Sequence, residues 1–269
     1  MSATVYAGWQ KRPISAKLQI RTATRADVPS IFALATSLFG TRQFLYTIYQ
    51  SPLAQRYLEK RVVAASRTNP FFILEVHGKF IGYYEAIVGE TNCFLNYIGI
   101  AKSSAGHSYG TRLLTHYGRL ARDCGRTELA LEVFESNERA LRWYDRLGFT
   151  QKGARYLTRL EIANVADNGM TASLNTAELQ AALQEEAVSG FSKVVCDVGQ
   201  YSILLGLIGG HSCKLLHHSG LHIDTAIQIS ASLMAGKRQV LIVSSPERLC
   251  PKLPVLSAET VLQMGKTLD

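Results

Sequence analysis

The sequence lacks a hydrophobic run long enough to cross a membrane. Its longest apolar stretch, Tyr201 to Gly210, is about half of the roughly 20 residues that a spanning helix requires. That stretch is predicted to be a buried strand or hairpin. The first residues, MSATVYAGWQKRPISAKLQ, also lack the central apolar segment of a secretory signal. We therefore expect a cytoplasmic protein without a membrane partner.

Cysteine is sparse and carries no pairing pattern. The five cysteines are odd in number, widely spread and without a CxxC pair. This argues against a disulfide framework and against a zinc ribbon. We expect reduced, mostly buried thiols and no bound metal. The positions are Cys93, Cys124, Cys196, Cys213 and Cys250.

Acidic residues are scarce in the first part of the chain. The net charge is +8, and residues 1–163 hold 22 Lys and Arg against 12 Asp and Glu, while residues 164–269 hold 7 against 9. A basic first part suits a phosphate-rich cofactor or nucleic acid, although a solvated basic face without a partner explains it equally well. No helix-turn-helix, zinc-finger or RNP signature is present, which makes nucleic acid the less favoured partner. A hydrophobic content of 47% and a charged content of 19% indicate a folded, soluble chain.

The length of 269 residues favours two domains. After an N-terminal extension, residues 1–17, the pattern over residues 18–162 predicts the order β-α-α-β-β-β-α-β-α-β. Residues 18–163 are therefore interpreted as the first domain. The polar, turn-rich residues 164–170 are predicted to be a linker.

Residues 171–269 predict a second, smaller α/β domain whose role the sequence does not define. Asn175 and Glu178 indicate a capping box, and Asp224 and Ser257 are expected to cap two further helices. The expected strands are KVVCDV, YSILLGLI and RQVLIVSS. No internal repeat is visible in the sequence.

Two features of this second part suggest chemistry only weakly. The stretch CDVGQYSILLGLIGG resembles the first phosphate hairpin of actin-like kinases, but an ordinary hairpin with glycine turns is favoured. A group of histidines with a nearby cysteine and aspartate could bind metal, yet its spacing matches no zinc template. Solvated or structural histidines are the favoured interpretation for His211, His217, His218 and His222, with Cys213 and Asp224.

The segment LEVFESNERALRWYDRLGF, residues 131–149, reads as a strand that leads into a helix. Leucine and valine alternate with carboxylates in the strand, which places Glu132 on its polar face. In the helix, Ala140, Trp143, Tyr144 and Leu147 share one face. The segment therefore brings Glu132 and Tyr144 toward one region.

The segment YIGIAKSSAGHSYGTRLL predicts a strand, a loop with Gly106 and Gly110, and the start of a helix. Unpaired backbone N–H groups at a helix N-terminus, reinforced by the helix dipole, form a site for a pyrophosphate. On its own, an ordinary strand-to-helix loop explains this segment better.

Three blocks taken together resemble the GCN5-related N-acetyltransferase (GNAT) family, particularly the branch similar to ribosomal-protein alanine acetyltransferases. The blocks are IRTATRADVPSIFAL, IGI followed by AGHSYGTRLL, and LEVFESN with the downstream Ala140, Tyr144, Gly148 and Phe149. The resemblance covers residues 18–162. It implies an α/β (α+β) fold with a mixed, strongly twisted sheet, and transfer of an acetyl group from acetyl-CoA to a primary amine.

The resemblance also implies the roles of individual residues. The strand that ends in IGI would splay from its neighbour and contact the pantetheine, and the following loop would cradle the pyrophosphate. Tyr144 would protonate the CoA sulfur, and Glu132 would take the amine proton, with Glu85 as its rival. Asn137 would fix the turn into the helix and touch the pantetheine, while Arg112 and Arg119 are either phosphate contacts or ordinary surface charge. The cofactor residues are Ile98, Gly99, Ile100, Gly106, His107, Ser108, Tyr109, Gly110, Thr111, Asn137 and Tyr144.

The cofactor loop departs from the family pattern Arg/Gln-x-x-Gly-x-Gly. Ala105 and Ser108 stand at two of its conserved positions, and Lys102 replaces a frequent proline. Ser108 adds a Cβ where the backbone must approach phosphate. A non-catalytic acyl-CoA sensor and an interaction protein that keeps only the scaffold therefore remain alternatives. The acceptor, expected near residues 44–65, and a homodimer also stay open.

Overall fold

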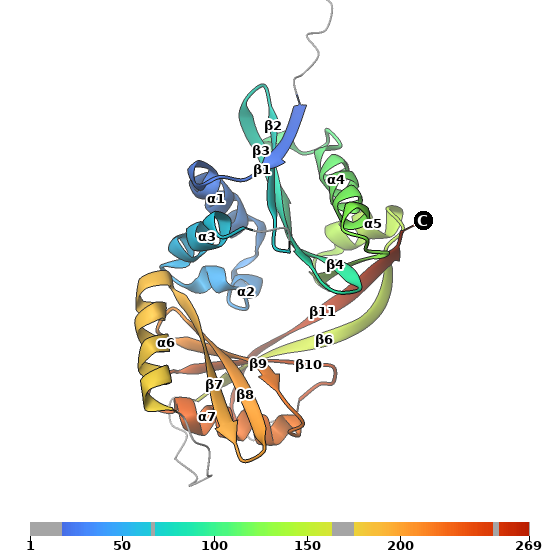
Figure 1. The fold of residues 1–269 in the computed structure, drawn as a ribbon. Coiled ribbons are helices and arrows are strands. Elements are labelled where there is room, and N and C mark those ends of the chain that lie inside the picture. Colours follow the sequence, from blue (N-terminus) through green and yellow to red (C-terminus); the bar gives the residue numbers. More distant parts are fainter. Residues whose placement is uncertain (1–17, 66–67, 163–174, 250–252, 269) are drawn as a thin grey trace, which may run out of the picture.

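Residues 18–65, 68–162, 175–249 and 253–268 are described by a computed structural model. Within them, eleven strands form one sheet in the order β1-β2-β3-β4-β5-β11-β6-β10-β9-β8-β7. Figure 1 shows this sheet bending through the whole molecule, with the long strands β11 and β6 side by side at its centre. The predicted N-terminal extension and linker lie outside the described residues.

The first half has the predicted order of elements, with its second helical region divided into short pieces. Two antiparallel hairpins lead to β4, which runs parallel to β5. The elements are β1 (Leu18–Thr22), α1 (Val28–Leu38), α2 (Thr41–Phe44), α3 (Ala54–Val63), β2 (Phe71–Val76), β3 (Lys79–Val88), β4 (Asn92–Ile100), α4 (Tyr109–Asp123), β5 (Glu128–Phe134), α5 (Glu138–Arg146) and β6 (Thr150–Glu161).

The second half confirms most of the predicted elements, but it differs from the prediction in the cap of α7, in the additional strand β9 and in the conformation of residues 255–267. Asn175 caps α6 through its side chain, as predicted, whereas His222 rather than Asp224 is the N-cap of α7. The histidine-containing segment forms a strand, β9, that the sequence patterns did not identify. The elements are α6 (Thr176–Ser189), β7 (Phe191–Val198), β8 (Tyr201–Ile208), β9 (Ser212–His218), α7 (Ile223–Met234), β10 (Val240–Ser245) and β11 (Val255–Thr267).

The helix expected after Ser257 is wrong, because residues 255–267 form strand β11. Alanine and glutamate in this segment favour a helix, but Thr260 and Val261 are β-branched and suit a strand. The deciding influence is tertiary, since β11 pairs on one side with β5 and on the other with β6. Both rows of its backbone hydrogen-bonding groups are thereby satisfied inside the sheet.

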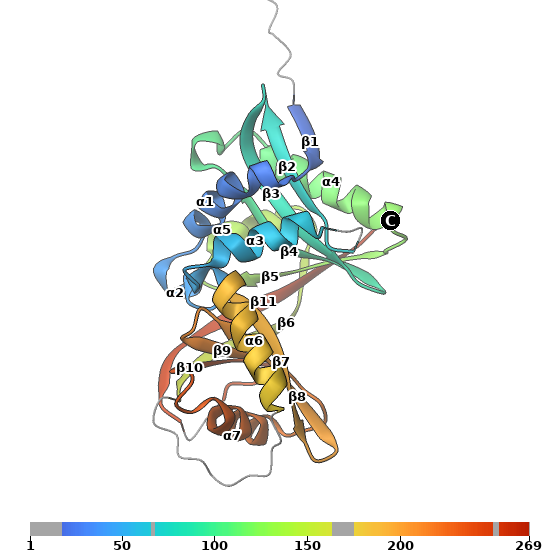
Figure 2. The same ribbon diagram turned by 60° about the vertical axis from the view of Figure 1, so that its left-hand side comes forward.

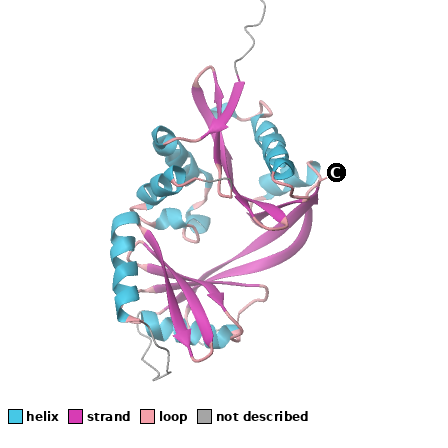
Figure 3. Cartoon of the chain, in the orientation of Figure 1, coloured by secondary structure: helices cyan, strands magenta, loops and turns pink. Residues whose placement is uncertain are grey.

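The two halves repeat one topology although the sequence shows no repeat. In the first half the order is α3-β2-β3-β4-α4-β5, and in the second it is α6-β7-β8-β9-α7-β10. Each half has three antiparallel strands followed by a helix and a strand parallel to the third, since β4 pairs in parallel with β5 and β9 with β10. Figure 3 shows the strands of both halves in magenta, with helices packed around them in cyan.

The halves exchange their last strands. β6, at the end of the first half, pairs with β10 of the second, and β11, at the end of the second, pairs with β5 of the first. The pairing of β6 with β11 joins them at the centre. The sequence predicted a separate second domain. The strands of both halves instead form one continuous sheet.

Helices cover both faces of the first half, as Figure 2 shows from the side of α1 and α3. Residues of α4 and α5 form one core with Leu131 and Val133 of β5, and residues of α1 and α3 form a second core on the opposite face. In the second half, α6 and α7 share one core with β7 to β10. The site lies where these layers meet, around the ends of β4 and β5.

Met264 of β11 packs in the core of the first half and is 7% exposed. We expect Met264→Ala to lower the free energy of unfolding by about 2 to 4 kcal/mol, because it leaves a cavity among first-half residues. Leu256→Ala is the matched control on the same strand, since Leu256 is 47% exposed. Urea unfolding measures both variants. Equal, small effects would contradict the embedding of β11 in the first half.

Candidate active site

An opening between β4 and β5 is the centre of the candidate site. The parallel register between the two strands runs from Asn92 and Glu128 to Leu95 and Leu131 and then ends. Beyond it, Ile98 and Ile100 stay paired with β3, and Glu132 stays paired with β11. The strands therefore diverge, and backbone groups of β4 that point away from β3 lack a partner from β5. Gly99, between the two isoleucines, lies under Leu38 of α1.

The loop between β4 and α4 turns through two residues with positive φ. Gly106 has φ +85° and Ser108, the N-cap of α4, has φ +58°. The amide of Arg112 already bonds the carbonyl of Ser108 at 3.1 Å, whereas Tyr109, Gly110 and Thr111 supply the first N–H groups of the helix, which have no intrahelical acceptor. These amides and the positive end of the helix dipole create a favourable place for an anion.

His107 is tied into this loop instead of extending from it. Its Nδ1 lies 3.0 Å from the carbonyl oxygen of Ala105, so this nitrogen donates a proton there. Its ring stacks on Tyr109 with centroids 5.5 Å apart. Both contacts fix the backbone that precedes the helix.

Ser108 occupies a conformation that glycine adopts at no steric cost. A left-handed residue with a Cβ is strained by roughly 1 to 2 kcal/mol. The serine hydroxyl makes no capping hydrogen bond in return. Ser108 therefore keeps the left-handed backbone conformation that suits the glycine of the family pattern, but it carries a side chain that glycine lacks.

Trp143 of α5 closes the side of the site next to α4. A Cβ placed on Gly110 would lie 3.0 Å from the Trp143 indole, so a larger residue would require the indole to shift by a few tenths of an ångström. The indole also lies beside Tyr144, with ring centroids 4.9 Å apart. The sequence placed Trp143 on the same helix face as Tyr144 but gave it no part in the site.

Tyr144 is buried, with 6% of its surface exposed, between Trp143 and Phe149. Its ring centroid is 5.6 Å from that of Phe149. Burial raises the pKa of the Tyr144 hydroxyl well above its usual value, because the charged phenolate would lose its hydration. The hydroxyl therefore keeps its proton through the neutral pH range.

Glu132 lies on the opposite face of β5 from the leucine and valine that contact α4 and α5. Its carboxylate is 3.2 Å from the amide nitrogen of Gln263, which donates to it, and 3.6 Å from Nε of Arg155. The side chain keeps 35% exposure. Tyr144 and Glu132 thus lie on opposite sides of β5, the strand that diverges from β4 next to Leu131.

Glu85, the rival base, is held in a buried ion pair. It is 3% exposed and accepts a hydrogen bond from Arg61. Burial raises the pKa of the Glu85 carboxyl, while the charge of Arg61 and a hydrogen bond from Asn96 oppose that shift. Its partners leave it less accessible to a substrate amine than Glu132.

The second half adds a lysine that the sequence analysis did not consider. Lys214 lies on β9, opposite Ile242 of β10 in the register. Burial lowers the pKa of Lys214, the nearby Arg155 lowers it further, and Glu132 raises it. The charges of three residues therefore lie close enough to interact, and they come from strands of both halves: Glu132, Arg155 and Lys214.

The segment around α2 covers this face of the sheet. The hydroxyl of Tyr46 donates to Ser257 at 2.9 Å, Gln43 donates to Ser136 at 2.9 Å, and Arg42 pairs with Glu259 at 3.4 Å. Ser212 of β9 donates to Gln50 at 3.1 Å. Tyr46 and Gln50 lie in the region in which the acceptor was expected, and they contact β11 and β9 of the second half.

The remaining predicted residues have simpler surroundings. Asn137 caps α5 by accepting a hydrogen bond from the Ala140 amide at 3.2 Å, which confirms its role in the turn. Arg112 and Arg119 are exposed on α4. His218 bonds the Leu221 carbonyl and His222 caps α7. Within the described residues, no three His, Cys, Asp or Glu side chains gather as metal ligands.

The match to known families agrees with the motifs of this site. Residues 36–149 match the Acetyltransferase (GNAT) family. This part of the chain contains β4, the loop, α4, β5 and α5, and its sequence is similar to that of the GNAT acetyltransferase family. No curated protein matched the sequence.

Solved structures extend the likeness to nearly the whole chain. A GCN5-related N-acetyltransferase from Sphaerobacter thermophilus is 11% identical, with a TM-score of 0.63 over 93% of this chain and 95% of that one. A tandem GNAT protein from the clavulanic acid biosynthesis pathway is 10% identical, with a TM-score of 0.62 over 93% and 98%. One from Kribbella flavida is 12% identical, with a TM-score of 0.55 over 96% and 73%.

At these identities the likeness concerns the fold alone. It shows an α+β mixed sheet of GNAT type whose similarity to a tandem protein includes the second half, in keeping with the repeated topology. Among the helices of the described residues, none is long and apolar enough to cross a membrane.

Replacing Ser108 by glycine removes the steric cost of its positive φ. We expect Ser108→Gly to raise the free energy of unfolding by about 1 kcal/mol. Ser108→Ala is the matched control, because it removes the hydroxyl and keeps the Cβ in the same conformation. Denaturant unfolding compares the three proteins. Stabilisation by alanine equal to that by glycine would contradict the strain at this position.

Proposed function

We propose that this protein is an acetyl-CoA-dependent N-acetyltransferase that moves the acetyl group to a primary amine by direct attack. The observation that carries the proposal is the opening between β4 and β5, with helix N-terminal amides at one end and a buried, protonated tyrosine beside it. The family of residues 36–149 supports the same reaction class.

Acetyl-CoA would bind along the strand that leads into the loop. The unpaired backbone groups among Ile98, Gly99 and Ile100 suit the amides of the pantetheine, which hydrogen-bond as a further strand would. The amides of Tyr109, Gly110 and Thr111 suit the pyrophosphate. Gly106, His107 and Ser108 shape the loop before them, and Asn137, the N-cap of α5, would touch the pantetheine.

The reaction requires that a neutral amine attacks the thioester carbonyl carbon, that the carbon–sulfur bond breaks, and that the sulfur receives a proton. Glu132 would accept the proton that the amine releases, directly or through water. Tyr144 would donate its proton to the departing sulfur, which its raised pKa permits because the hydroxyl is still protonated at neutral pH. Backbone N–H groups of β4 would stabilise the negative charge that develops on the carbonyl oxygen.

The acceptor would approach from the face of Glu132, opposite to α4 and α5. Tyr46, Arg155 and Lys214 border this face, and they come from three separate parts of the chain. A protein N-terminus, a lysine and a small amine all fit the proposed chemistry. The branch similar to ribosomal-protein alanine acetyltransferases remains a prediction from the sequence motifs.

A non-catalytic acyl-CoA sensor is the second candidate function. The observation that favours it is the phosphate loop, in which Ser108 holds a strained backbone and Ala105 offers no polar group. Binding of acetyl-CoA without turnover, tested with a broad panel of amines, would support the sensor.

Tyr144→Phe removes the proposed proton donor and keeps the ring. We expect kcat to fall by about 100-fold or more, because proton transfer by a positioned side chain contributes on that order. The dissociation constant of acetyl-CoA should change little. Thiol release and calorimetry measure the two quantities, with Tyr156→Phe on β6 as a control. Full kcat in Tyr144→Phe would rule out the assigned acid.

Glu132→Gln removes the proposed base while it keeps the hydrogen-bonding shape of the side chain. We expect kcat to fall by about 100-fold near neutral pH. The deficit should shrink as the pH rises above the pKa of the acceptor amine, because the free amine then needs no base. Glu85→Gln provides the comparison, and a larger, pH-dependent loss there would transfer the role to Glu85.

A further inference from the structure

Among the described strands, β7 forms one edge of the sheet and pairs with β8 alone. The register between the two runs without a bulge from Phe191 and Ile208 to Val198 and Tyr201. β7 also contains no proline. Bulges and prolines are two of the devices by which proteins keep edge strands from pairing with other chains. The outer edge of β7 is therefore a regular row of backbone hydrogen-bonding groups that suits a further strand.

Three side chains on one face of β7 are exposed: Lys193, Val195 and Asp197. The opposite face is covered by α6, whose residues form one core with Val194 and Cys196. Val195 is 46% exposed, although a branched apolar side chain is stabilised by burial. The edge thus presents an apolar side chain between two opposite charges.

The two charges on this face have no ion partner within the described part of the chain. The residues opposite Lys193 and Asp197 on β8 are Gly206 and Ser202, which are uncharged. Lys193 and Asp197 cannot pair with each other, because residues four apart on a strand are separated by about 13 Å. Both charges are therefore available to a partner.

The strand at the other edge of the sheet, β1, differs in this respect. Its Arg21 donates to Asp27 at 2.8 Å and to Glu75 at 2.7 Å, so its charge is used inside the chain. β1 is also shorter, with five residues against eight in β7. The unused pair of opposite charges is thus a property of the β7 edge.

We propose that β7 is the interface for a second copy of this chain, whose own β7 pairs with it in antiparallel orientation across a two-fold axis at Val195. In this register Lys193 of each copy lies opposite Asp197 of the other, and the two Val195 side chains meet. A two-fold interface requires a surface that is complementary to itself, which this order of residues provides. Phe191, whose carbonyl accepts a hydrogen bond from Ser189 at 2.7 Å, lies outside the pairing.

The charges also select this register against its neighbours. An axis at Lys193 would place the two lysines opposite each other, and an axis at Asp197 would do the same with the two aspartates. Like charges directly opposite each other destabilise an antiparallel pair. Backbone hydrogen bonds would thus supply affinity, and the side chains would determine the register.

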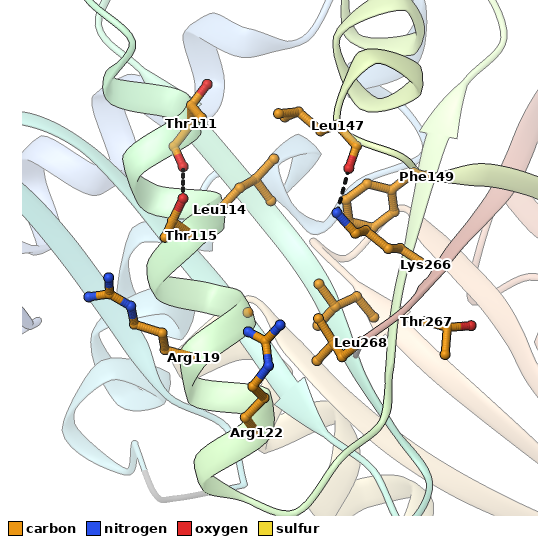
Figure 4. A pocket seen from close by; sticks show the side chains of 12 residues that line it. Thr111, Leu114, Thr115, Arg119, Arg122, Leu147, Phe149, Lys266, Thr267 and Leu268 are labelled. Carbon is orange, nitrogen blue, oxygen red and sulfur yellow. Dashed lines mark hydrogen bonds between the residues drawn. The ribbon is translucent and has the colours of Figure 1, made fainter.

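The proposed interface is remote from the residues of the proposed chemistry. β11, β6, β10, β9 and β8 lie between β5 and β7, which separates these two by about 29 Å along the sheet. A cavity of about 230 Å³, shown in Figure 4, lies between α4 and the end of β11 that pairs with β5, with Thr111 and Lys266 in its walls. Pairing through β7 involves neither this cavity nor Tyr144. The proposal therefore does not depend on acetyl transfer.

Sedimentation equilibrium of the full chain over a range of concentrations tests the proposal. We expect the wild type to show a monomer–dimer equilibrium. Lys193→Asp and Asp197→Lys each place like charges opposite each other twice in the dimer, so each should raise the dissociation constant of the dimer by about tenfold or more. The double variant Lys193→Asp/Asp197→Lys exchanges the charges and keeps them complementary. Its dissociation constant should return close to that of the wild type.

Lys79→Asp is the matched control, because it makes the same change of charge at an exposed residue of β3. It should dimerise as the wild type does, and thermal unfolding identifies any variant that fails to fold. A monomeric wild type, or single variants that dimerise as well as the wild type, overturns the proposal. A folded double variant that stays monomeric overturns the proposed register. A wild type that dimerises but does not bind acetyl-CoA would contradict the proposed function and leave this interface assigned.

Discussion

The antiparallel pairing of β6 with β11 is the constraint on which the rest of the structure depends. Each strand comes from one half and is paired on its other side with the opposite half, β6 with β10 and β11 with β5. Backbone hydrogen bonds buried in the middle of a sheet are costly to leave unmade. The two halves are therefore joined through their centre, and not through a linker between finished units.

This junction also determines the surroundings of Glu132. Gln263 of β11 and Arg155 of β6 contact its carboxylate, and Lys214 acts on the same group from β9. None of these three residues belongs to the motifs that identify the chemistry. The first half, which contains the motifs, supplies Tyr144 and the loop before α4. The exchanged strands and the second half supply the polar and charged groups around Glu132 on the proposed acceptor side.

Local patterns predicted the first half well because its signals are local. The alternation around Leu131, the cap at Asn137 and the helix face with Tyr144 need only a few neighbouring residues, and the order of elements follows from them. β11 could not be predicted in this way, because its conformation depends on partners that lie 95 residues or more away in the sequence. The positive φ of Ser108 and the approach of Trp143 to Gly110 likewise depend on how α4 meets its neighbours.

The exchange of strands has a consequence for how the chain reaches its native state. Phe134 pairs with Val261, so β5 exposes an unpaired edge until the second half has been synthesised. Contacts of such sequence separation slow folding, and an open strand edge during that time invites pairing with other chains. The first half contains the proposed chemistry, yet the edge of β5 lacks its native partner until β11 of the second half has been synthesised.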